Sequence, residues 1–108
     1  MRVVHYLNQF FGGIGGEEHA DTEPQVHDEP VGPGRLLGQI LGENAQVVRT
    51  IVCGDNYATE NMEALTALVL EQTKDAQADI FVAGPCCEAG RYGVASAGLC
   101  VAVSSELD

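Results

Sequence analysis

The segment RVVHYLNQFFGGIGGEE, from Arg2 to Glu18, joins an apolar run to a turn that contains four glycines. Its first half, RVVHYL, has the β-branched and aromatic residues that strands favour. Glycine permits positive φ and close approach of backbone, so the cluster indicates a tightly folded turn. The connector continues to about residue 30, beyond the roughly 2–6 residues of an ordinary strand-to-helix link, and such loops are either functional or disordered. We favour a functional loop.

Two further apolar runs, AQVVRTIVCGD (Ala45 to Asp55) and ADIFVAGP (Ala78 to Pro85), also have the composition of strands. Apolar residues at helical spacing form three sets between and after the strands: Leu36, Leu37, Ile40 and Leu41; Met62, Leu65, Leu68 and Val69; and Tyr92, Ala95, Leu99, Ala102 and Val103. Strands that alternate with helices predict a parallel sheet with right-handed crossovers. We therefore expect a three-layer α/β fold of the Rossmann or flavodoxin-like type, with a short three-stranded parallel sheet and flanking helices.

The chain length bounds the organisation of the protein. With 108 residues, 45% of them hydrophobic, residues 1–108 form a single α/β domain at most. Three strands leave two sheet edges exposed, and SSELD follows the last helix where another strand is expected. These features indicate a fragment of a larger chain, and they favour self-association as a homo-oligomer or pairing with another protein.

The charge balance excludes several classes of partner. Five Lys and Arg against 16 Asp and Glu give a net charge of −11, which argues against nucleic acid and anionic membranes as partners. No apolar run reaches the ~18–20 residues of a membrane span, and the N-terminus lacks the pattern of a secretory signal. We expect a cytoplasmic protein whose four cysteines remain thiols.

Ligands of parallel α/β folds bind beyond the carboxyl ends of the strands. Three segments are expected to meet there: Asn8–Gly16, Cys53–Tyr57 and Gly84–Tyr92. The candidate substrate-binding residues are Asn8, Gly12, Gly13, Gly15, Gly16, Glu17, Cys53, Asp55, Tyr57, Arg91 and Tyr92. Arg91, near a predicted helix start, would bind a carboxylate or phosphate together with free backbone N–H groups. Alternatively, the small residues beside it only allow close helix packing, and Arg91 pairs with a surface acid.

The segment GPGRLLG, residues 32–38, resembles a dinucleotide-binding fingerprint, but that motif requires glycine at Leu37 and a turn directly after the first strand. A helix start with Pro33 in the first turn is the better interpretation. The three histidines, at positions 5, 19 and 27, lack the spacing of metal ligands, and we expect no metal site.

The cysteines divide into two groups. Cys53 and Cys100 follow or lie among apolar residues, and we interpret both as buried core residues. Cys86 and Cys87 lie in the predicted turn before the last helix, where a helix N-terminus would favour a thiolate. A reactive role for one of them and a purely structural one both remain open.

Three motifs together resemble one known family: VVHYLNQFFGGIGGEEHAD, VGPG with VCGDNY, and AGPCCEAGRYGVA. They are similar to the N-terminal part of component B, selenoprotein B, of the glycine, sarcosine, betaine and D-proline reductases, and the similarity spans essentially all 108 residues. The resemblance implies reductive cleavage of the C–N bond of glycine or an N-methylated derivative. It also implies two partner components, a pyruvoyl-type subunit and a selenoprotein A-like carrier from which the product emerges as acetyl phosphate.

In that family a selenocysteine or cysteine attacks the carbon beside nitrogen, in a redox motif that lies beyond the region matched here. The resemblance therefore implies no catalytic residue and no cofactor within these residues, and we expect the fragment alone to be inactive. Cys86 and Cys87 occupy a turn where small or aromatic residues are expected, which leaves the choice among glycine, sarcosine and betaine open.

The function predicted from the sequence is that of the N-terminal domain of a substrate-specific reductase subunit, which binds a small amino-acid-like substrate or docks other subunits. The alternative is a non-catalytic Rossmann-type module that binds a small anion or a partner protein during assembly.

Overall fold

The computed structural model describes residues 1–85 and 90–107. Along the chain the elements are β1 (Arg2–Asn8), the 3-10 helix η1 (Glu17–His19), β2 (Gln25–His27), α1 (Pro33–Leu41), the 3-10 helix η2 (Gly42–Asn44), β3 (Gln46–Cys53), α2 (Asp55–Glu60), α3 (Met62–Asp75), β4 (Ile80–Ala83) and α4 (Arg91–Leu107). The three predicted strands and the three predicted helical segments are all present.

The sheet has the strand order β2-β3-β1-β4. β1 lies in the centre and pairs in parallel with both β3 and β4; Tyr6 is opposite Ile51 on one side and Ala83 on the other. Six of the seven residues of β1 are buried, because helices cover both faces of this strand. The predicted parallel arrangement of these three strands is confirmed.

The expectation of only three strands is wrong, because β2 adds a fourth at one edge. It pairs antiparallel with β3, with Val26 opposite Ile51 and His27 opposite Thr50. The Thr50 hydroxyl also donates a hydrogen bond of 2.7 Å to the carbonyl oxygen of Glu29, just after the strand. The long connector therefore covers one edge of the sheet as well as linking β1 to α1.

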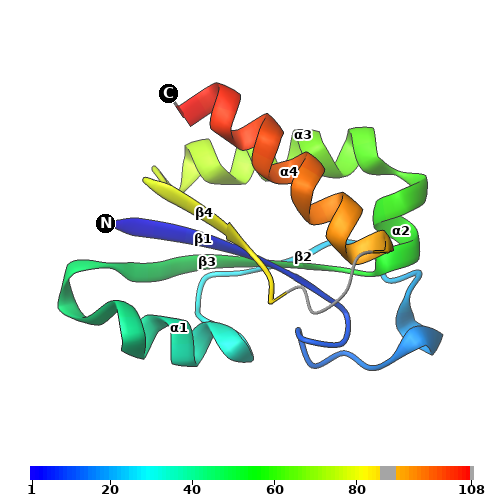
Figure 1. The fold of residues 1–108 in the computed structure, drawn as a ribbon, viewed down its shortest axis with the longest axis horizontal. Helices are drawn as coiled ribbons and strands as arrows, with labels where there is room; N and C mark the ends of the chain where they lie inside the picture. Colours follow the sequence, from blue (N-terminus) through cyan, green and yellow to red (C-terminus); the bar gives the residue numbers. More distant parts are fainter. Residues whose placement is uncertain (86–89, 108) are drawn as a thin grey trace.

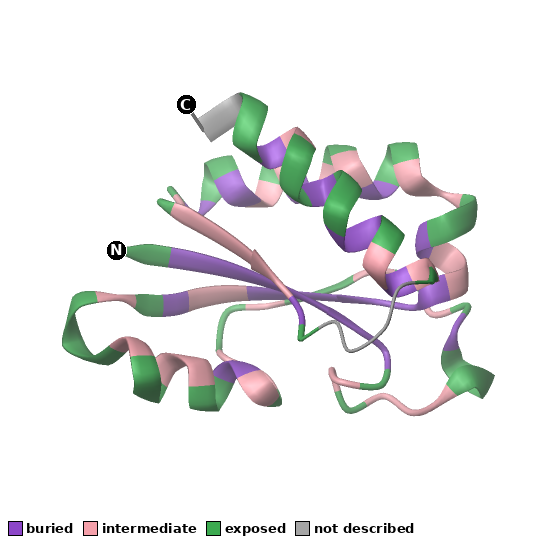
Figure 2. Cartoon of the chain, viewed as in Figure 1, coloured by how far each residue is buried: buried purple, intermediate pink, exposed green. Residues whose placement is uncertain are grey.

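The helices form two layers around the sheet (Figure 1). α1 lies on one face, whereas α2, α3 and α4 lie on the other. The larger core lies between the sheet and α3 and α4, and its buried residues include Val4, Tyr6, Ile51, Leu65, Val69, Ala95, Leu99 and Val103. Figure 2 shows buried segments facing the sheet and exposed segments on the outer side of α4. The predicted three-layer α/β architecture is therefore present.

One expectation about burial needs correction. Cys100 is exposed, because it lies one residue after Leu99 and a helix turns by about 100° per residue, away from the core. On α1 the side chains of Leu36 and Ile40 are 59% and 73% exposed. Both line a groove of about 390 Å³ between α1 and the edge strand β4.

None of the helices in residues 1–85 and 90–107 has the length and apolarity needed to cross a bilayer.

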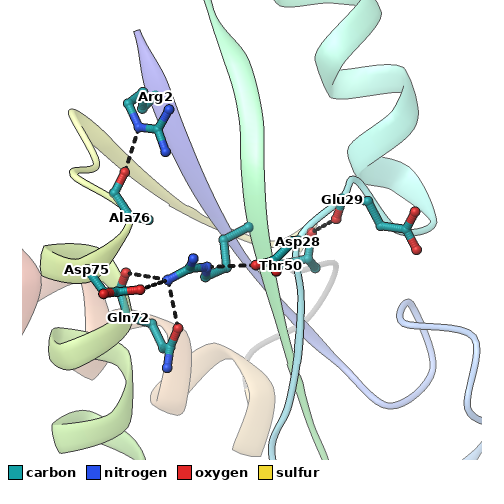
Figure 3. Close-up of polar contacts among 8 residues, drawn as sticks. Arg2, Asp28, Glu29, Thr50, Gln72, Asp75 and Ala76 are labelled. Atoms are coloured by element: carbon teal, nitrogen blue, oxygen red, sulfur yellow. Dashed lines mark hydrogen bonds and ion pairs between the residues drawn. The ribbon is translucent and has the colours of Figure 1, made fainter.

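Arg49 connects β3 to its neighbours on both sides. Its guanidinium donates to Asp28 (3.1 Å) after β2 and to Gln72 Oε1 (2.9 Å) and Asp75 (2.8 Å) at the end of α3. Figure 3 shows these acceptors converging from two elements, with the nearby contact of Arg2 to the carbonyl of Ala76. The basic residues Arg2 and Arg49 thus serve the fold at the amino-terminal side of the sheet, away from the candidate site.

Candidate functional site

The glycine-rich turn folds back over the end of the central strand. The amide of Gly12 donates to the Asn8 carbonyl and that of Ile14 to the Gln9 carbonyl, each at 2.9 Å. Gly13 has φ of 80°, a region that non-glycine residues rarely adopt. A Cβ on Gly12 would lie 2.3 Å from a methyl carbon of Val52. The glycines therefore allow the turn to pack against β3 and to carry Glu17 toward the last helix.

Arg91, the first residue of α4, pairs with Glu17 at the end of this turn. Its Nη2 lies 2.5 Å and 2.6 Å from the two carboxylate oxygens of Glu17, and this pair raises the pKa of Arg91. The side chains are 37% and 71% exposed, so solvent weakens the attraction. This pairing is the structural alternative left open by the sequence, and the binding of a ligand carboxylate by Arg91 stays a prediction.

Asp55, the first residue of α2 and two residues after the end of β3, lies beside the end of β1. The Asn8 side-chain nitrogen donates to Asp55 Oδ2 at 3.1 Å, and the Asn8 oxygen accepts from the amide of Phe11 at 3.0 Å. The backbone N–H of Asp55 donates to Gln9 Oε1 at 2.9 Å. Two amide side chains from the end of β1 therefore fix the position and orientation of this carboxyl group.

The other oxygen of this carboxyl group is poorly satisfied. Asp55 is 8% exposed, and its Oδ1 is buried with no hydrogen-bond partner among the described residues. Burial raises the pKa of Asp55, while Asn8 and the more distant Arg91 charge act in the opposite direction. A buried carboxyl group with a perturbed pKa in a cluster of polar side chains is typical of a functional site.

We expect ionisation of Asp55 to destabilise the fold. Because its pKa is raised in the folded state, the folded chain holds this proton more strongly, and stability decreases as pH rises from the unfolded value of about 3.9 through the folded value. In Asp55→Asn this contribution is absent, so the unfolding free energy should decrease less over that interval. Urea denaturation of both chains from about pH 4 to 7 measures the difference; parallel pH profiles would contradict it.

The remaining predicted residues do not join this polar cluster. Cys53 is buried, its thiol is directed toward the carbonyl oxygens of Gly54 (3.5 Å) and Thr22 (3.9 Å), and burial raises its pKa to about 12. Tyr57 packs against the core. Tyr92 is buried, with its ring centroid 6.2 Å from that of Tyr6. These three residues therefore belong to the apolar core and its border rather than to the polar cluster.

The structure thus brings together Asn8, Glu17, Asp55 and Arg91 at the carboxyl ends of the strands, with Gly12, Gly13, Gly15 and Gly16 in the turn that connects the first two. Sequence reasoning missed Gln9, although a second amide side chain directly after a buried strand was a signal for it. It also missed Phe11, whose ring lies 6.1 Å from that of Tyr92. Cys86 and Cys87 lie outside the described residues.

Comparisons with known proteins match the whole chain to one family. The family model for glycine/sarcosine/betaine reductase selenoprotein B covers residues 1–108. A sarcosine reductase complex component B subunit beta of Peptoclostridium acidaminophilum is 50% identical over 99% of this chain and 24% of its own length. A glycine reductase complex component B subunit gamma of Peptoclostridium litorale is 52% identical over the same shares.

A betaine reductase complex component B subunit beta of Peptoclostridium acidaminophilum is 41% identical over 97% of this chain and 24% of its own length. The chain therefore spans about a quarter of the length of these curated relatives. No solved structure matches it. The match over all residues, together with the motifs at the carboxyl ends of the strands, shows that the chain belongs to the glycine/sarcosine/betaine reductase selenoprotein B family.

Proposed function

We propose that this chain is the N-terminal part of a substrate-specific reductase subunit that takes part in reductive C–N cleavage of glycine, sarcosine or betaine. Membership of the family and the names of the relatives support a reductase subunit. The order of the parallel strands, β3-β1-β4, supports a Rossmann or flavodoxin-like half in which ligands bind at the carboxyl ends. Other reductase components, a pyruvoyl-type subunit and a selenoprotein A-like carrier, are the proposed partners.

The role proposed for this part is binding of the substrate carboxylate, and the observation that carries it is the contact of Arg91 with Glu17. Nη2 of Arg91 already donates to both oxygens of a carboxylate, that of Glu17, at 2.5 Å and 2.6 Å. A guanidinium offers several N–H donors in a plane that matches such a group. All three proposed substrates carry a carboxylate, so it is the group that one cation can recognise in each of them.

The chemical step is assigned to residues outside this part. Cys53 is an unsuitable nucleophile because burial raises its pKa to about 12, which keeps the thiol protonated at neutral pH. Cys100 lies on the exposed side of α4, away from Asp55 and Glu17. We therefore propose that the selenocysteine or cysteine redox centre lies elsewhere in the full-length protein and that the isolated part has no reductase activity.

In the complete subunit, Arg91→Lys is expected to weaken binding of the carboxylate-bearing substrates by about tenfold or more, because lysine lacks the planar set of donors. Calorimetric titration with glycine, sarcosine and betaine measures the effect. Arg35→Lys is the matched control: Arg35 is exposed on α1, on the opposite face of the sheet. Affinities that are unchanged in Arg91→Lys for every ligand would remove Arg91 from the site.

A second function, a non-catalytic docking or assembly module, is favoured by the groove between α1 and β4. Leu36, Ile40 and Val82 line it, and the first two are largely exposed. Substituting Leu36 and Ile40 with glutamate would separate the two functions. Under the docking function the complex with the other components is lost, whereas under the substrate-binding function calorimetric affinities are retained.

A further inference from the structure

Asp55 lies in the first turn of α2, where the helix dipole favours a carboxylate, but one of its oxygens is buried without a hydrogen bond within the described residues. Its Oδ2 accepts from Asn8, its Oδ1 has no partner among the described residues, and its side chain does not cap α2. Asparagine could accept the same bond from Asn8 without the cost of burying a charge. The nearest cationic influence on it comes from Arg91, whose Nη2 is occupied by Glu17. The helix N-terminus accounts for a carboxyl group at this position, but not for an oxygen that is buried without a partner among the described residues.

The group is also held in advance of any ligand. Gln9 accepts the Asp55 backbone N–H, and the Gln9 side-chain nitrogen lies 3.4 Å from the carbonyl oxygen of Gly16, so one side chain connects Asp55 to the glycine-rich turn. Residues that are positioned by a second layer of hydrogen bonds are suited to binding, because little ordering is needed when the ligand arrives. Asp55 Oδ1, the oxygen without a partner, is thus held in place next to the turn that carries Glu17.

The contact between Glu17 and Arg91 joins the glycine-rich turn to the start of α4. Both side chains reach solvent, and exposed ion pairs of this kind contribute little to stability. A ligand carboxylate can therefore replace the Glu17 carboxylate on Arg91. Asp55 lies beside this contact, because Gln9 joins its backbone N–H to the carbonyl oxygen of Gly16, the residue before Glu17. A ligand that also carries a positive charge would then meet Asp55.

We propose that Asp55 binds the amino group of the amino-acid substrate, so that Asp55 and Arg91 form the two poles of one zwitterion site. This inference rests on the proposed function, because it assumes that Arg91 receives the substrate carboxylate. Glycine and sarcosine carry N–H donors that can bond to Oδ1, while the trimethylated nitrogen of betaine offers charge without a donor. Asp55 therefore favours ligands with N–H groups.

The test compares glycine with glycolate, in which a hydroxyl replaces the ammonium group. In the complete subunit, Asp55→Asn is expected to lower the affinity for glycine by about tenfold or more, because a charge-assisted hydrogen bond is lost. The affinity for betaine should decrease less, and the affinity for glycolate should equal that of the wild type. Calorimetric titration gives all three affinities. An unchanged glycine affinity, or equal losses for glycine and glycolate, would overturn the proposal.

Asp21→Asn is the matched control. Asp21 is an exposed acid in the connector that also carries Glu17, and its charge also acts on Arg91. The glycine affinity of this variant should change less than about twofold. Arg91→Lys should lower the affinities for glycine and for glycolate by similar factors. If it weakens neither, the carboxylate role of Arg91 fails, and the glycine-selective loss in Asp55→Asn still decides the role of Asp55. If Asp55→Asn does not fold, Asp55→Glu replaces it, with a larger loss expected for glycine than for glycolate and equal losses contradicting the proposal.

Discussion

Replacing Gly54 with alanine is expected to lower the free energy of unfolding by roughly 3 kcal/mol or more. A Cβ here would lie 2.3 Å from the carbonyl oxygen of Ala20 and 2.7 Å from the backbone nitrogen of Thr22. Both atoms belong to the backbone, so the overlap can be relieved only by moving the chain. Gly54 itself has an ordinary φ of −65°, and the expected cost arises from contact rather than from backbone strain.

The displaced segment is the one that anchors the connector to α2. The Ala20 carbonyl accepts from the amides of Asn56 and Tyr57 at 2.8 Å and 3.0 Å, and Gly54 donates to Thr22 at 2.9 Å. Moving Ala20 away would weaken these bonds. It would also shift Glu17, three residues earlier, relative to Arg91, so ligand affinity should decrease together with stability.

Gly38→Ala is the control for this experiment, because a Cβ at Gly38 would meet nothing within 4 Å. Alanine within a helix is favoured over glycine, so Gly38→Ala should raise stability by about 0.5–1 kcal/mol. Chemical denaturation of the two variants and the wild-type chain measures both effects. A Gly54→Ala chain as stable as wild type would contradict the close packing of the connector on α2.

The sequence was sufficient to predict the parallel strands and α4 because their patterns reflect burial within single elements. Apolar residues make up most of β1 (RVVHYLN) and of β3 (QVVRTIVC), and the spacing of Ala95, Leu99 and Val103 matches one helix face. β2 was missed because its three residues have little strand character of their own. Its pairing depends on β3, which is distant in the sequence, and local patterns carry no information on such a partner.

The candidate site was predictable in outline for a topological reason. The carboxyl ends of parallel strands lie at one edge, which placed Asn8 and Asp55 together before the structure was known. The partner of Arg91 was not predictable, since Glu17 is separated from it by 74 residues and several other acids were available to pair with it. The orphan oxygen of Asp55 likewise depends on packing around a single atom, which the sequence does not encode in any local pattern.

Truncation of Leu99 to alanine is expected to lower the free energy of unfolding by about 2–5 kcal/mol. Leu99 is fully buried between α4 and the rest of the larger core, close to Leu65 and Val69 of α3 in the same cluster. The side chain of Met62, in α3, packs beside the adjacent Gly98, because a Cβ there would lie 2.8 Å from its terminal methyl. The expected loss combines the transfer of the removed atoms with the cavity that they leave behind.

Val101→Ala is the matched control, since Val101 lies on the same helix two residues later but is exposed; it should change stability by less than about 0.5 kcal/mol. A domain of this size has a total stability of about 5–15 kcal/mol, so the loss at Leu99 is a large fraction of it. Because α4 begins at Arg91, loosening of the helix should also weaken carboxylate binding. Denaturation midpoints that are equal for Leu99→Ala and Val101→Ala would show that α4 is not held by this apolar face.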